Sequence, residues 1–485
     1  MPELGYNDLR DFIELCRQHG DVRDIEGADW DLEIGALTEA AAELLPDPPM
    51  FLFDNIKGYP AGYRALSLPI ASFRNACLAL GLPLDKSLLE NVRLGFRKIK
   101  ETKPVPPVEV KDGPVMENVL TGDEVDILRF PAPHYTRSDG GRYIGTGDSL
   151  INRDPESGYV NMGTYRMQVH ERNLLGLWMS PGQQARQICQ RYWDQGKSCP
   201  IVATFGNDPM TFMASHTKRP FGSSELDFVG GLKGRPMEVI RGPVTGLPIP
   251  AYAEIAIEGE VPPPSEEVRA EGPFGEWPGY SSGGTLGTGE LQPVIRIKAL
   301  YFRNDPILLS EAPLWPGAPK RALPLHAGLI WEQLESAGIQ DIAGVFIHTD
   351  YLVVVSIRQR YAGHAKQTAM AAIGCAAAAR NGRYVVIVDE DIDPTNMKEV
   401  LWAMKTRVDP ATDIELIDGT WSTPLDPRMP PEKRKSGDYT NSRAIFYAVR
   451  PFVWRDKFPK SSRSERALRE EVVRKYKSIL PFPNI

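Results

Sequence analysis

The stretch from Glu254 to Tyr280 reads EIAIEGEVPPPSEEVRAEGPFGEWPGY and joins a strand pattern to a turn rich in glycine and proline. Its first residues alternate between isoleucine and polar or small residues, which predicts a half-buried strand. In the turn, only four residues separate Glu271 from Glu276. Burial beside Phe274 and Trp277 would raise a carboxyl pKa, and two nearby carboxylates push their pKa values apart. The turn is therefore either an acid–base site or a solvated acidic loop.

A second polar group lies upstream, in the stretch NMGTYRMQV from Asn161 to Val169. Polar and apolar residues alternate here, which predicts a strand with Arg166 projecting from one face. Such an arginine is either exposed at a sheet edge or buried with carboxylate partners, because an unpaired buried charge is costly. If Arg166 is buried, Glu271 and Glu276 are the candidate partners. A guanidinium could hold both carboxylates, or the carboxylate of a substrate.

The whole chain has 485 residues, of which 42% are hydrophobic and 25% charged, as in ordinary globular proteins of about two or three domains. A net charge of −7 without a dominant basic stripe argues against nucleic-acid binding. Five widely spaced cysteines fit a reducing cytoplasm and indicate neither a zinc site nor a disulfide framework. No window approaches about 18 uninterrupted apolar residues, so we expect no membrane span and no secretion signal.

The pattern along the chain changes twice. Up to about residue 102, the sequence predicts four helices and one strand. The helices are expected at 7–19, 31–45, 71–80 and 84–96, and the strand at 50–53. A proline-rich linker follows from Lys103. From Ile127 to about Leu309, glycine turns separate short strand patterns, which predicts a β-rich, barrel-like domain with a helix at 182–195.

A second proline-rich boundary, near Pro313 to Pro324, precedes the last third. There, strand and helix patterns alternate, which predicts an α/β domain; the strands are expected at 352–358 and 384–388, and the helices at 324–337, 365–379 and 396–407. The basic tail from Lys457 to Lys477 is interrupted by glutamates and predicts an amphipathic surface helix.

The common catalytic motifs are missing from the sequence. Gly145-Thr146-Gly147 lacks the rest of a dinucleotide-binding fingerprint, and no Walker sequence, HExxH or GxSxG motif occurs. Seven scattered histidines give no local support to a histidine-based triad.

Several stretches together resemble the UbiD family of decarboxylases, which use prenylated flavin mononucleotide (prFMN) made by a separate flavin prenyltransferase. The matching stretches are NMGTYRMQV (161–169), ELDFVGGLKGRPMEVIRG (225–242), EIAIEGE (254–260), EGPFGEWPGY (271–280), RQRYAGHAK (358–366), VIVDEDID (386–393) and LWAMKTRVDP (401–410). The resemblance runs from PMFLFDNIKGY, which starts at Pro49, to about Pro410.

This resemblance implies a Glu–Arg–Glu network formed by Glu271, Arg166 and Glu276. Arg166 would orient the substrate carboxylate and contact the flavin. Glu276 would protonate the carbon atom after carbon dioxide leaves, and Glu271 would hold Arg166 and tune the pair.

The resemblance also implies a divalent metal, usually manganese, that bridges the cofactor phosphate through Asn161, Gln184 and Glu225. The family has a histidine where this chain has Gln184. A neutral amide oxygen can bind a hard cation but is a less usual ligand for a transition metal. The other cofactor positions fall on Thr146, Thr164, Gln183, Ser215 and Lys366. The backbone of Ala214-Ser215 would bind a nearby potassium ion.

The implied fold is α/β (α+β). It comprises an N-terminal α/β segment packing on the cofactor domain (1–115), a split β-barrel-like catalytic domain that binds prFMN (116–315), an α/β oligomerisation domain (320–450) and a tail with an amphipathic helix (451–485). The implied protein is a cytoplasmic, reversible, non-oxidative decarboxylase, a carboxy-lyase. Its substrate would be an aromatic, heteroaromatic or α,β-unsaturated carboxylic acid. The protein would assemble as a homo-oligomer, either a dimer or a hexamer.

Two alternatives stay open at this point. One is an FMN- or metal-dependent enzyme that acts on carboxylates without the prenyl group. The other is a flavin-binding subunit of a multi-protein carboxylase, either non-catalytic or dependent on a partner. The acid that serves as substrate and the physiological direction of the reaction are open as well.

Overall fold

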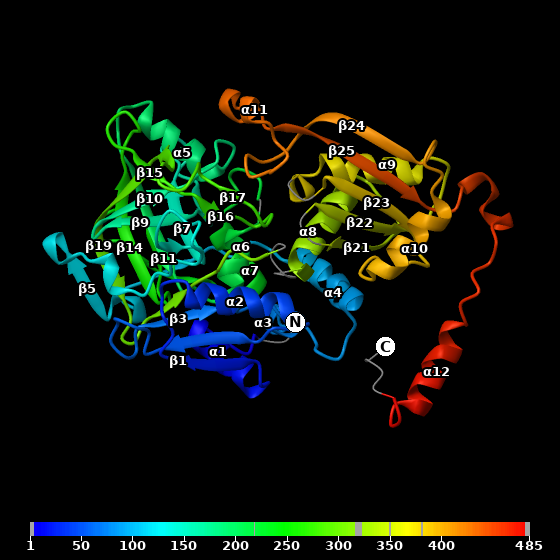
Figure 1. Cartoon of the computed structure of the whole chain (residues 1–485), viewed down its shortest axis with the longest axis horizontal. Coiled ribbons are helices and arrows are strands. Elements are labelled where there is room, and N and C mark those ends of the chain that lie inside the picture. The colour runs from blue at the N-terminus through cyan, green and yellow to red at the C-terminus, as the bar shows by residue number, and fades with distance from the viewer. Residues whose placement is uncertain (1–3, 218, 316–322, 349–350, 380–381, 481–485) are drawn as a thin grey trace. The chain divides into compact units, whose positions relative to one another are not determined.

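The computed structural model describes residues 4–217, 219–315, 323–348, 351–379 and 382–480 (Figure 1). The chain forms two compact units. Unit 1 comprises Met1–Gly81, Glu101–Ala322 and Thr423–Gly437. Unit 2 comprises Leu82–Lys100, Leu323–Ser422 and Asp438–Ile485. The boundary predicted near Pro313 to Pro324 falls largely on 316–322, outside the described residues.

The N-terminal part of unit 1 is a small α/β layer. Its four-stranded sheet has the order β1-β2-β3-β20 and consists of β1 (Val22–Glu26), β2 (Met50–Asp54), β3 (Arg64–Ser67) and β20 (Ile307–Leu309). The helices of this layer are α1 (Leu9–Gln18), α2 (Glu33–Leu44) and α3 (Phe73–Leu80). Asp8 and Ser72 cap α1 and α3 by accepting backbone N–H groups, as the residue types predict. The helices predicted at 7–19, 31–45 and 71–80 and the strand predicted at 50–53 are therefore confirmed here, whereas the helix predicted at 84–96 belongs to unit 2.

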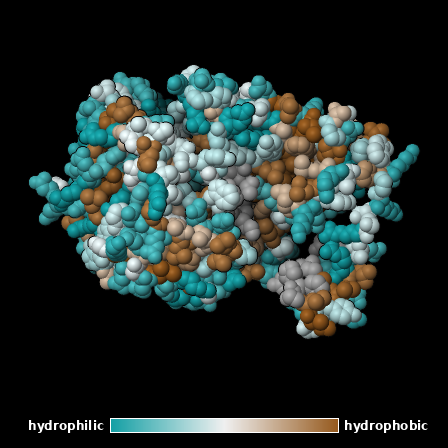
Figure 2. All heavy atoms as spheres, in the orientation of Figure 1, coloured by the Kyte–Doolittle hydropathy of each residue, from teal (hydrophilic) through white to brown (hydrophobic). Residues whose placement is uncertain are grey.

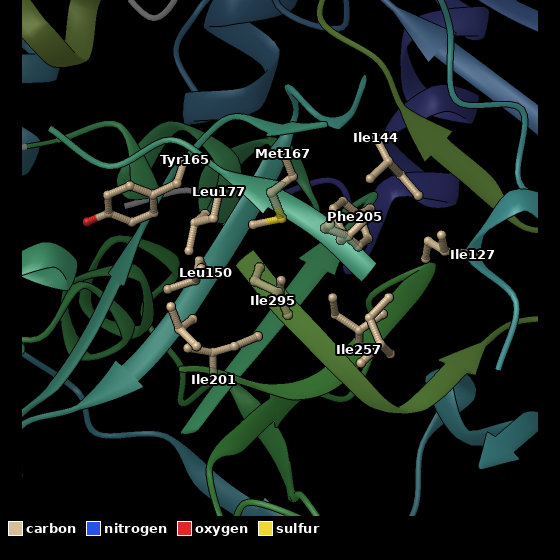
Figure 3. Packing of buried hydrophobic residues seen from close by; sticks show 14 of the residues in the cluster. Ile127, Ile144, Leu150, Tyr165, Met167, Leu177, Ile201, Phe205, Ile257 and Ile295 are labelled. Atoms are coloured by element: carbon tan, nitrogen blue, oxygen red, sulfur yellow. The ribbon is translucent and has the colours of Figure 1, made fainter. Parts of the chain in front are cut away.

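A nine-stranded sheet forms the centre of unit 1, with β6-β9-β10-β19-β14-β11-β7-β8 in order and β5 paired to β19. Its strands are β5 (Asn118–Thr121), β6 (Tyr143–Gly145), β7 (Asp148–Arg153), β8 (Val160–Gly163), β9 (Met167–Glu171), β10 (Leu174–Leu177), β11 (Cys199–Phe205), β14 (Ile255–Val261) and β19 (Val294–Phe302). Leu150, Ile201, Ile257 and Ile295 come from neighbouring strands and pack into one core on its face (Figure 3). The β-rich middle of the chain is thus confirmed.

The strand that opens the quoted stretch is buried at six of its seven residues, so the half-buried prediction was wrong. β14 lies between β11 and β19, and both Glu254 and Glu258 are completely buried. Glu254 accepts two hydrogen bonds from Arg10 at 2.8 Å, and Glu258 accepts from Tyr301 Oη at 2.6 Å and Thr245 N at 2.7 Å. Partners distant in sequence satisfy these carboxylates, which is why the local alternation misplaced them.

Smaller elements complete unit 1. They include short sheets built from β4 (Val108–Val110), β12 (Glu238–Arg241), β13 (Pro248–Pro250), β15 (Arg269–Glu271), β16 (Phe274–Gly275), β17 (Ser281–Ser282) and β18 (Glu290–Gln292). The helices are α5 (Gln184–Trp193), α6 (Pro209–Ser215), α7 (Glu225–Lys233) and α11 (Pro431–Ser436), with 3₁₀ turns η1 (Pro114–Met116), η2 (Gly122–Glu124) and η3 (Ile127–Arg129). The buried face of α5 joins the core of the large sheet, as its helical periodicity predicts.

Unit 2 is an α/β domain, as predicted. Its sheet has the order β21-β22-β23-β25-β24, formed by β21 (Ile342–His348), β22 (Leu352–Ile357), β23 (Tyr384–Asp389), β24 (Ile414–Trp421) and β25 (Thr440–Ala448). The three central strands, β22, β23 and β25, are parallel, so the two connections between them are crossovers. The helices of the unit are α4 (Leu88–Glu101), α8 (Leu323–Ser336), α9 (His364–Gly374), α10 (Met397–Arg407) and α12 (Arg466–Tyr476), with 3₁₀ turns η4 (Ala376–Ala378) and η5 (Phe452–Lys457).

Helix α9 is shorter than the predicted 365–379, because Cys375 adopts an extended backbone and the chain continues as a 3₁₀ turn. The amphipathic tail helix is present as α12, with Leu468 and Val472 exposed. No helix among the described residues is long and apolar enough to cross a membrane. On the face drawn in Figure 2, hydrophobic residues form scattered patches between hydrophilic ones.

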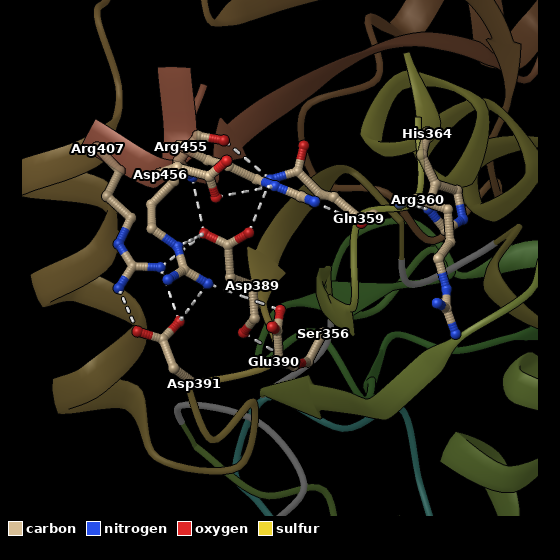
Figure 4. Close-up of polar contacts among 11 residues, drawn as sticks. Ser356, Gln359, Arg360, His364, Asp389, Glu390, Asp391, Arg407, Arg455 and Asp456 are labelled. Carbon is tan, nitrogen blue, oxygen red and sulfur yellow. Dashed lines mark hydrogen bonds and ion pairs between the residues drawn. The ribbon is translucent and has the colours of Figure 1, made fainter. Parts of the chain in front are cut away.

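A charged network lies at the carboxyl end of the parallel strands of unit 2 (Figure 4). Arg407 Nη1 donates to Asp389 Oδ2 at 2.8 Å, and its Nη2 donates to Asp391 Oδ2 at 2.8 Å. Arg450 Nε donates to Asp389 at 3.1 Å, and Gln359 Nε2 donates to Asp389 Oδ1 at 2.7 Å. Each buried carboxylate oxygen of Asp389 therefore has a donor.

Candidate active site

The turn after β15 carries two carboxylates toward one arginine. Glu271 ends β15 and is 0% exposed, and Arg166 is 8% exposed. Arg166 grips Glu271 with two parallel hydrogen bonds, from Nε to Oε1 at 2.8 Å and from Nη2 to Oε2 at 2.6 Å. Its Nη1 donates to Glu276 Oε1 at 2.5 Å and to Ser282 Oγ at 3.0 Å. The structure thus brings together the three residues that the sequence singled out.

Arg166 does not lie within a strand, which corrects the sequence-based expectation. The chain leaves the sheet after β8 at Gly163 and re-enters it at Met167. In this gap, Thr164 N donates to Ser215 O at 3.2 Å, and Tyr165 N donates to the buried Asp148 carboxylate at 3.2 Å. The strand pattern breaks because these backbone donors have partners outside the ladder. The break lets Arg166 turn toward the carboxylates.

Aromatic rings enclose the arginine. Its guanidinium carbon lies 4.6 Å from the ring centroid of Trp178 and 5.2 Å from that of Phe274. Both distances fall within the range of cation–π attraction. The rings also keep water from the salt bridges, which strengthens the charge interactions among the three residues.

The electrostatics of the three residues differ. Burial alone would lower the pKa of Arg166, but the charges of Glu276 and Glu271 outweigh it and raise that pKa. Burial raises the pKa of Glu276 above its usual value; Arg166 opposes this rise, and the charge of Glu271 adds to it. Arg166 therefore stays a cation, whereas Glu276 is a carboxyl group that burial biases toward its protonated form.

The three predicted metal ligands lie on different elements of unit 1. Asn161 is on β8, Gln184 begins α5, and Glu225 begins α7. Gln184 Oε1 accepts a hydrogen bond from Tyr159 Oη at 2.8 Å, and its Nε2 donates to Arg219 O at 2.7 Å. Burial and the charge of Glu225 both raise the pKa of Tyr159. Tyr159 therefore lies near two of the three predicted ligands.

Glu225 is a buried carboxyl group without a cationic side chain paired to it among the described residues. It accepts a hydrogen bond from Met162 N at 3.0 Å. Burial raises its pKa to about 7. Among the described residues, no group of three or more histidine, cysteine or acidic side chains is arranged to hold a metal ion. The predicted ligand set of one carboxylate and two amides, which would suit a hard cation, stays a prediction.

The predicted cofactor residues fall into separate groups. Thr164 Oγ1 and Ser215 Oγ are 2.8 Å apart, so these two residues form one polar group. Thr146 Oγ1 accepts from Glu311 N at 2.9 Å, and Gln183 Oε1 accepts from Ser180 N at 2.8 Å. The carbonyl of Ala214, expected to serve a potassium ion, accepts from Thr217 Oγ1 at 2.8 Å.

Lys366 belongs to unit 2, unlike the other predicted site residues. Its amine is paired with Glu415, whose second oxygen accepts a hydrogen bond from Tyr447 Oη at 2.8 Å. The lysine side chain is exposed. Its role toward a cofactor stays a prediction.

Sequence reasoning did not identify three side chains in these sites. Ser282 contacts both Arg166 and Glu276, Trp178 lies against the guanidinium, and Tyr159 binds Gln184. Ser282 follows the turn in a run of small residues, which gives no chemical signal. Trp178 is marked only by being aromatic, so nothing in a single sequence separates these residues from ordinary ones.

Comparisons with known proteins identify the family of the chain. Three stretches match the N-terminal (13–94), Rift-related (107–314) and C-terminal (322–448) domains described as those of 3-octaprenyl-4-hydroxybenzoate carboxy-lyase, UbiD. The chain is 30% identical to a phenolic acid decarboxylase from Streptomyces sp. (strain D7), over 88% of this chain and 90% of the relative.

Two solved structures are similar over nearly the whole chain. Vanillic acid decarboxylase from Sedimentibacter hydroxybenzoicus in closed form has a TM-score of 0.81 at 29% identity, covering 97% of this chain and 98% of that chain. The UbiD-class enzyme HmfF from Pelotomaculum thermopropionicum, solved in complex with FMN, has a TM-score of 0.81 at 25% identity, covering 97% of this chain and 100% of that chain.

Proposed function

Because the chain belongs to the UbiD family of carboxy-lyases, we propose that it is a prFMN-dependent, reversible, non-oxidative decarboxylase. Its substrate would be an aromatic, heteroaromatic or α,β-unsaturated carboxylic acid. Phenolic acids are the first class to test, since two similar proteins act on a phenolic acid and on vanillic acid. The observation that carries the proposal is the buried Arg166 held between Glu271 and Glu276.

Arg166 would bind and orient the substrate carboxylate. Its contacts to Glu271 use Nε and one N–H of Nη2, so Glu271 fixes the plane of the guanidinium. The Nη1 edge faces Glu276 and Ser282. A substrate carboxylate would therefore have to share this edge with Glu276 or displace it. A guanidinium that is held in one orientation can in turn hold the substrate carboxylate in one orientation.

Substrate binding would prepare Glu276 as the proton donor. An arriving carboxylate weakens the attraction of Arg166 for Glu276 and adds a second negative charge nearby. Both effects raise the pKa of Glu276, which burial already raises. When the carbon–carbon bond breaks and carbon dioxide leaves, the electron pair stays on the substrate carbon. Glu276 would then give its proton to that carbon and regain one from water.

Prenylated FMN, when bound, would supply the electron acceptor that decarboxylation at an unsaturated carbon needs and that side chains cannot provide. Thr146, Thr164, Gln183, Ser215 and Lys366 would hold the cofactor. Asn161, Gln184 and Glu225 would bind a divalent metal, manganese first among candidates, against its phosphate. A potassium ion would lie at the Ala214-Ser215 backbone. Glu225 supports the metal proposal, since it is a buried acid without an ion pair among the described residues.

The assembly is part of the proposal. We expect a homo-oligomer, a dimer or hexamer, with residues 320–450 as the oligomerisation domain. Sedimentation analysis of the purified protein would check this, and a monomer at micromolar concentration would contradict it.

The test of function begins with the cofactor. The protein would be co-expressed with a flavin prenyltransferase, the released cofactor weighed by mass spectrometry, and carbon dioxide release measured on a panel of acids. The panel would include vanillic acid, a heteroaromatic acid and a cinnamic-type acid. A prenylated mass together with turnover supports the proposal. Turnover with plain FMN favours an enzyme without the prenyl group, and turnover only after a partner is added favours the partner-dependent subunit.

A further inference from the structure

We propose that Gln168 is a positioning residue that ties the turn bearing Glu271 and Glu276 to the strand that follows Arg166. It deepens the proposed function and rests on it. Gln168 is the second residue of β9, two positions after Arg166, and is 5% exposed. In the sheet it pairs with Tyr143 of β6 and Gly176 of β10.

The side-chain amide of Gln168 makes two hydrogen bonds of opposite sense. Its Oε1 accepts from Gly272 N at 2.9 Å, and its Nε2 donates to Gly140 O at 2.9 Å. Gly272 directly follows Glu271. A neutral amide is the side-chain group that offers an acceptor and a donor side by side without a charge. Gln168 therefore links the carboxylate turn and the loop around Gly140 to one strand.

The loop around Gly140 then holds the same turn from the other side. Gly140 N donates to Pro273 O at 2.7 Å, and Gly275 N donates to Asp139 Oδ1 at 3.3 Å. These contacts and that of Gln168 act on the backbone between the two carboxylates. The spacing of Glu271 and Glu276 is thus set by a closed ring of hydrogen bonds, and Gln168 is the member that anchors the ring to the sheet.

The loop and the turn approach each other closely. A Cβ atom at Gly140 would lie 1.9 Å from the carbonyl oxygen of Gly272, and one at Gly141 would lie 2.8 Å from Gln168 Nε2. The first is a clash with backbone, so residue 140 must be glycine for the loop and the turn to pack in this way. The second shows that the amide of Gln168 lies directly against the loop.

Loss of the Gln168 amide should lower the rate of catalysis even though it removes only two hydrogen bonds. Arg166 engages Glu271 through two bonds that both require the turn to stay in register with β9. A displacement of about 1 Å at a reacting group costs roughly a hundredfold in rate. We therefore expect Gln168→Met to lower kcat by about that factor, through Glu271 and Glu276 rather than through any contact of its own with the substrate.

Gln168→Glu provides a rescue that depends on pH. A protonated glutamic acid can accept from Gly272 N and donate to Gly140 O, as the amide does. Once ionised, it can only accept, so the bond to Gly140 O is lost. We expect this variant to behave like the parent protein at low pH and like Gln168→Met at high pH. Because the carboxyl groups of Glu271 and Glu276 and the guanidinium of Arg166 lie nearby, a new charge at position 168 would itself change kcat at high pH. The site of loosening, in the turn or across unit 1, therefore distinguishes a lost bond to Gly140 O from a general effect of the buried charge.

Gln359→Met is the matched control. Gln359 is 7% exposed, lies in unit 2, and donates hydrogen bonds to Asp389 Oδ1 at 2.7 Å and Arg450 O at 2.9 Å. It is thus a similarly buried glutamine with two hydrogen bonds, and both partners of its side chain belong to unit 2. Its loss should lower thermal stability while leaving kcat and its pH profile as in the parent.

Two readouts decide the proposal: kcat as a function of pH, and hydrogen exchange of the peptide 268–280 relative to the rest of unit 1. We expect Gln168→Met to lose protection in that peptide, Gln168→Glu to lose it only at high pH, and Gln359→Met to keep it. Unchanged protection in Gln168→Met, or equal loosening across unit 1, would overturn the proposal. If the parent decarboxylates no acid, the proposed function fails, while hydrogen exchange still tests the role of Gln168.

Discussion

Two buried arginines, one in each unit, each bridge two carboxylates, but the pKa of Glu276 is raised whereas that of Asp391 is lowered. Arg166 is 8% exposed and bridges Glu271 and Glu276; Arg407 is 6% exposed and bridges Asp389 and Asp391. In unit 2, a second arginine, Arg450, also binds Asp389. The Arg166 cluster has one cation for two carboxylates. In unit 2, two cations, Arg407 and Arg450, lie within ion-pair distance of Asp391.

The pKa directions follow this difference in charge. Burial would raise the pKa of Asp391, but the hydrogen bonds and charges of Arg407 and the charge of Arg450 outweigh it and hold that pKa below its usual value. Burial raises the pKa of Glu276, and Arg166 alone does not reverse the shift. The two cations close to Asp391 therefore favour its anion, whereas the single cation close to Glu276 leaves an acid that can release a proton.

The largest effect is expected from breaking the Arg166 cluster. Arg166→Ala and Glu276→Gln should each abolish measurable turnover, a loss of roughly 10²–10⁴-fold for a placed acid. Arg166→Ala leaves Glu271 buried without its cation and should also lose stability, so circular dichroism would be used to confirm that the assayed protein is folded. Glu276→Gln keeps a neutral group of the same shape and should keep the fold. Asp391→Asn makes the same acid-to-amide change in unit 2 and should leave kcat unaltered. Full activity in either of the first two variants would refute the mechanism.

Breaking the Arg407 cluster should cost stability rather than activity. Arg407→Ala leaves Asp389 buried with one cation fewer, and losing one partner of a buried pair costs about 3–5 kcal/mol. Urea unfolding followed by hydrogen exchange in β23 would measure this. The remaining folded protein should retain its kcat. A drop in kcat without a drop in stability would mean that the two clusters do not differ as described.

Glu225 is a third buried acid, and a metal is expected to provide its missing charge. Tyr159→Phe removes the hydrogen bond that orients Gln184, and losing such an outer contact weakens metal binding by roughly 10–100-fold. Gln184→His should retain the metal or bind it more tightly. Metal content after dialysis would measure both. A clear loss of metal in Gln184→His would show that residue 184 is not a ligand.

The smallest effect is a shift in pH dependence. As a proton donor, Glu276 must be protonated, so turnover should fall as pH rises through its raised pKa. Glu271→Gln removes a negative charge that raises that pKa, so the high-pH limb of kcat should move to lower pH. A high-pH limb that does not move in Glu271→Gln would contradict the coupling between the two glutamates.

In unit 2 the pH dependence concerns stability. Asp391 has a lowered pKa, so its contribution to stability should be lost only as pH falls below about 3.8, its unshifted value.

Much of the fold was predictable from local patterns. The helices α1, α3, α5 and α10 and the strands β2, β22 and β23 lie within a few residues of their predicted positions. Helix periodicity, capping residues and runs of β-branched residues act over a few neighbouring positions, so they can be read from one sequence. The motif NMGTYRMQV and the turn EGPFGEWPGY likewise contain the three charged residues of the arginine cluster, and both stretches are recognisable in the sequence alone.

Local conformation and the identity of the reactive side chains could therefore be inferred from the order of amino acids alone. Their environment depends on the folded chain: Glu254 and Glu258 are buried, Arg166 lies outside a strand, and Gln168 joins the turn to the sheet. Distance along the chain explains this difference. Arg166 meets Glu271 105 positions later and Glu276 110 positions later. Burial and pKa depend on such partners, and no local pattern contains them.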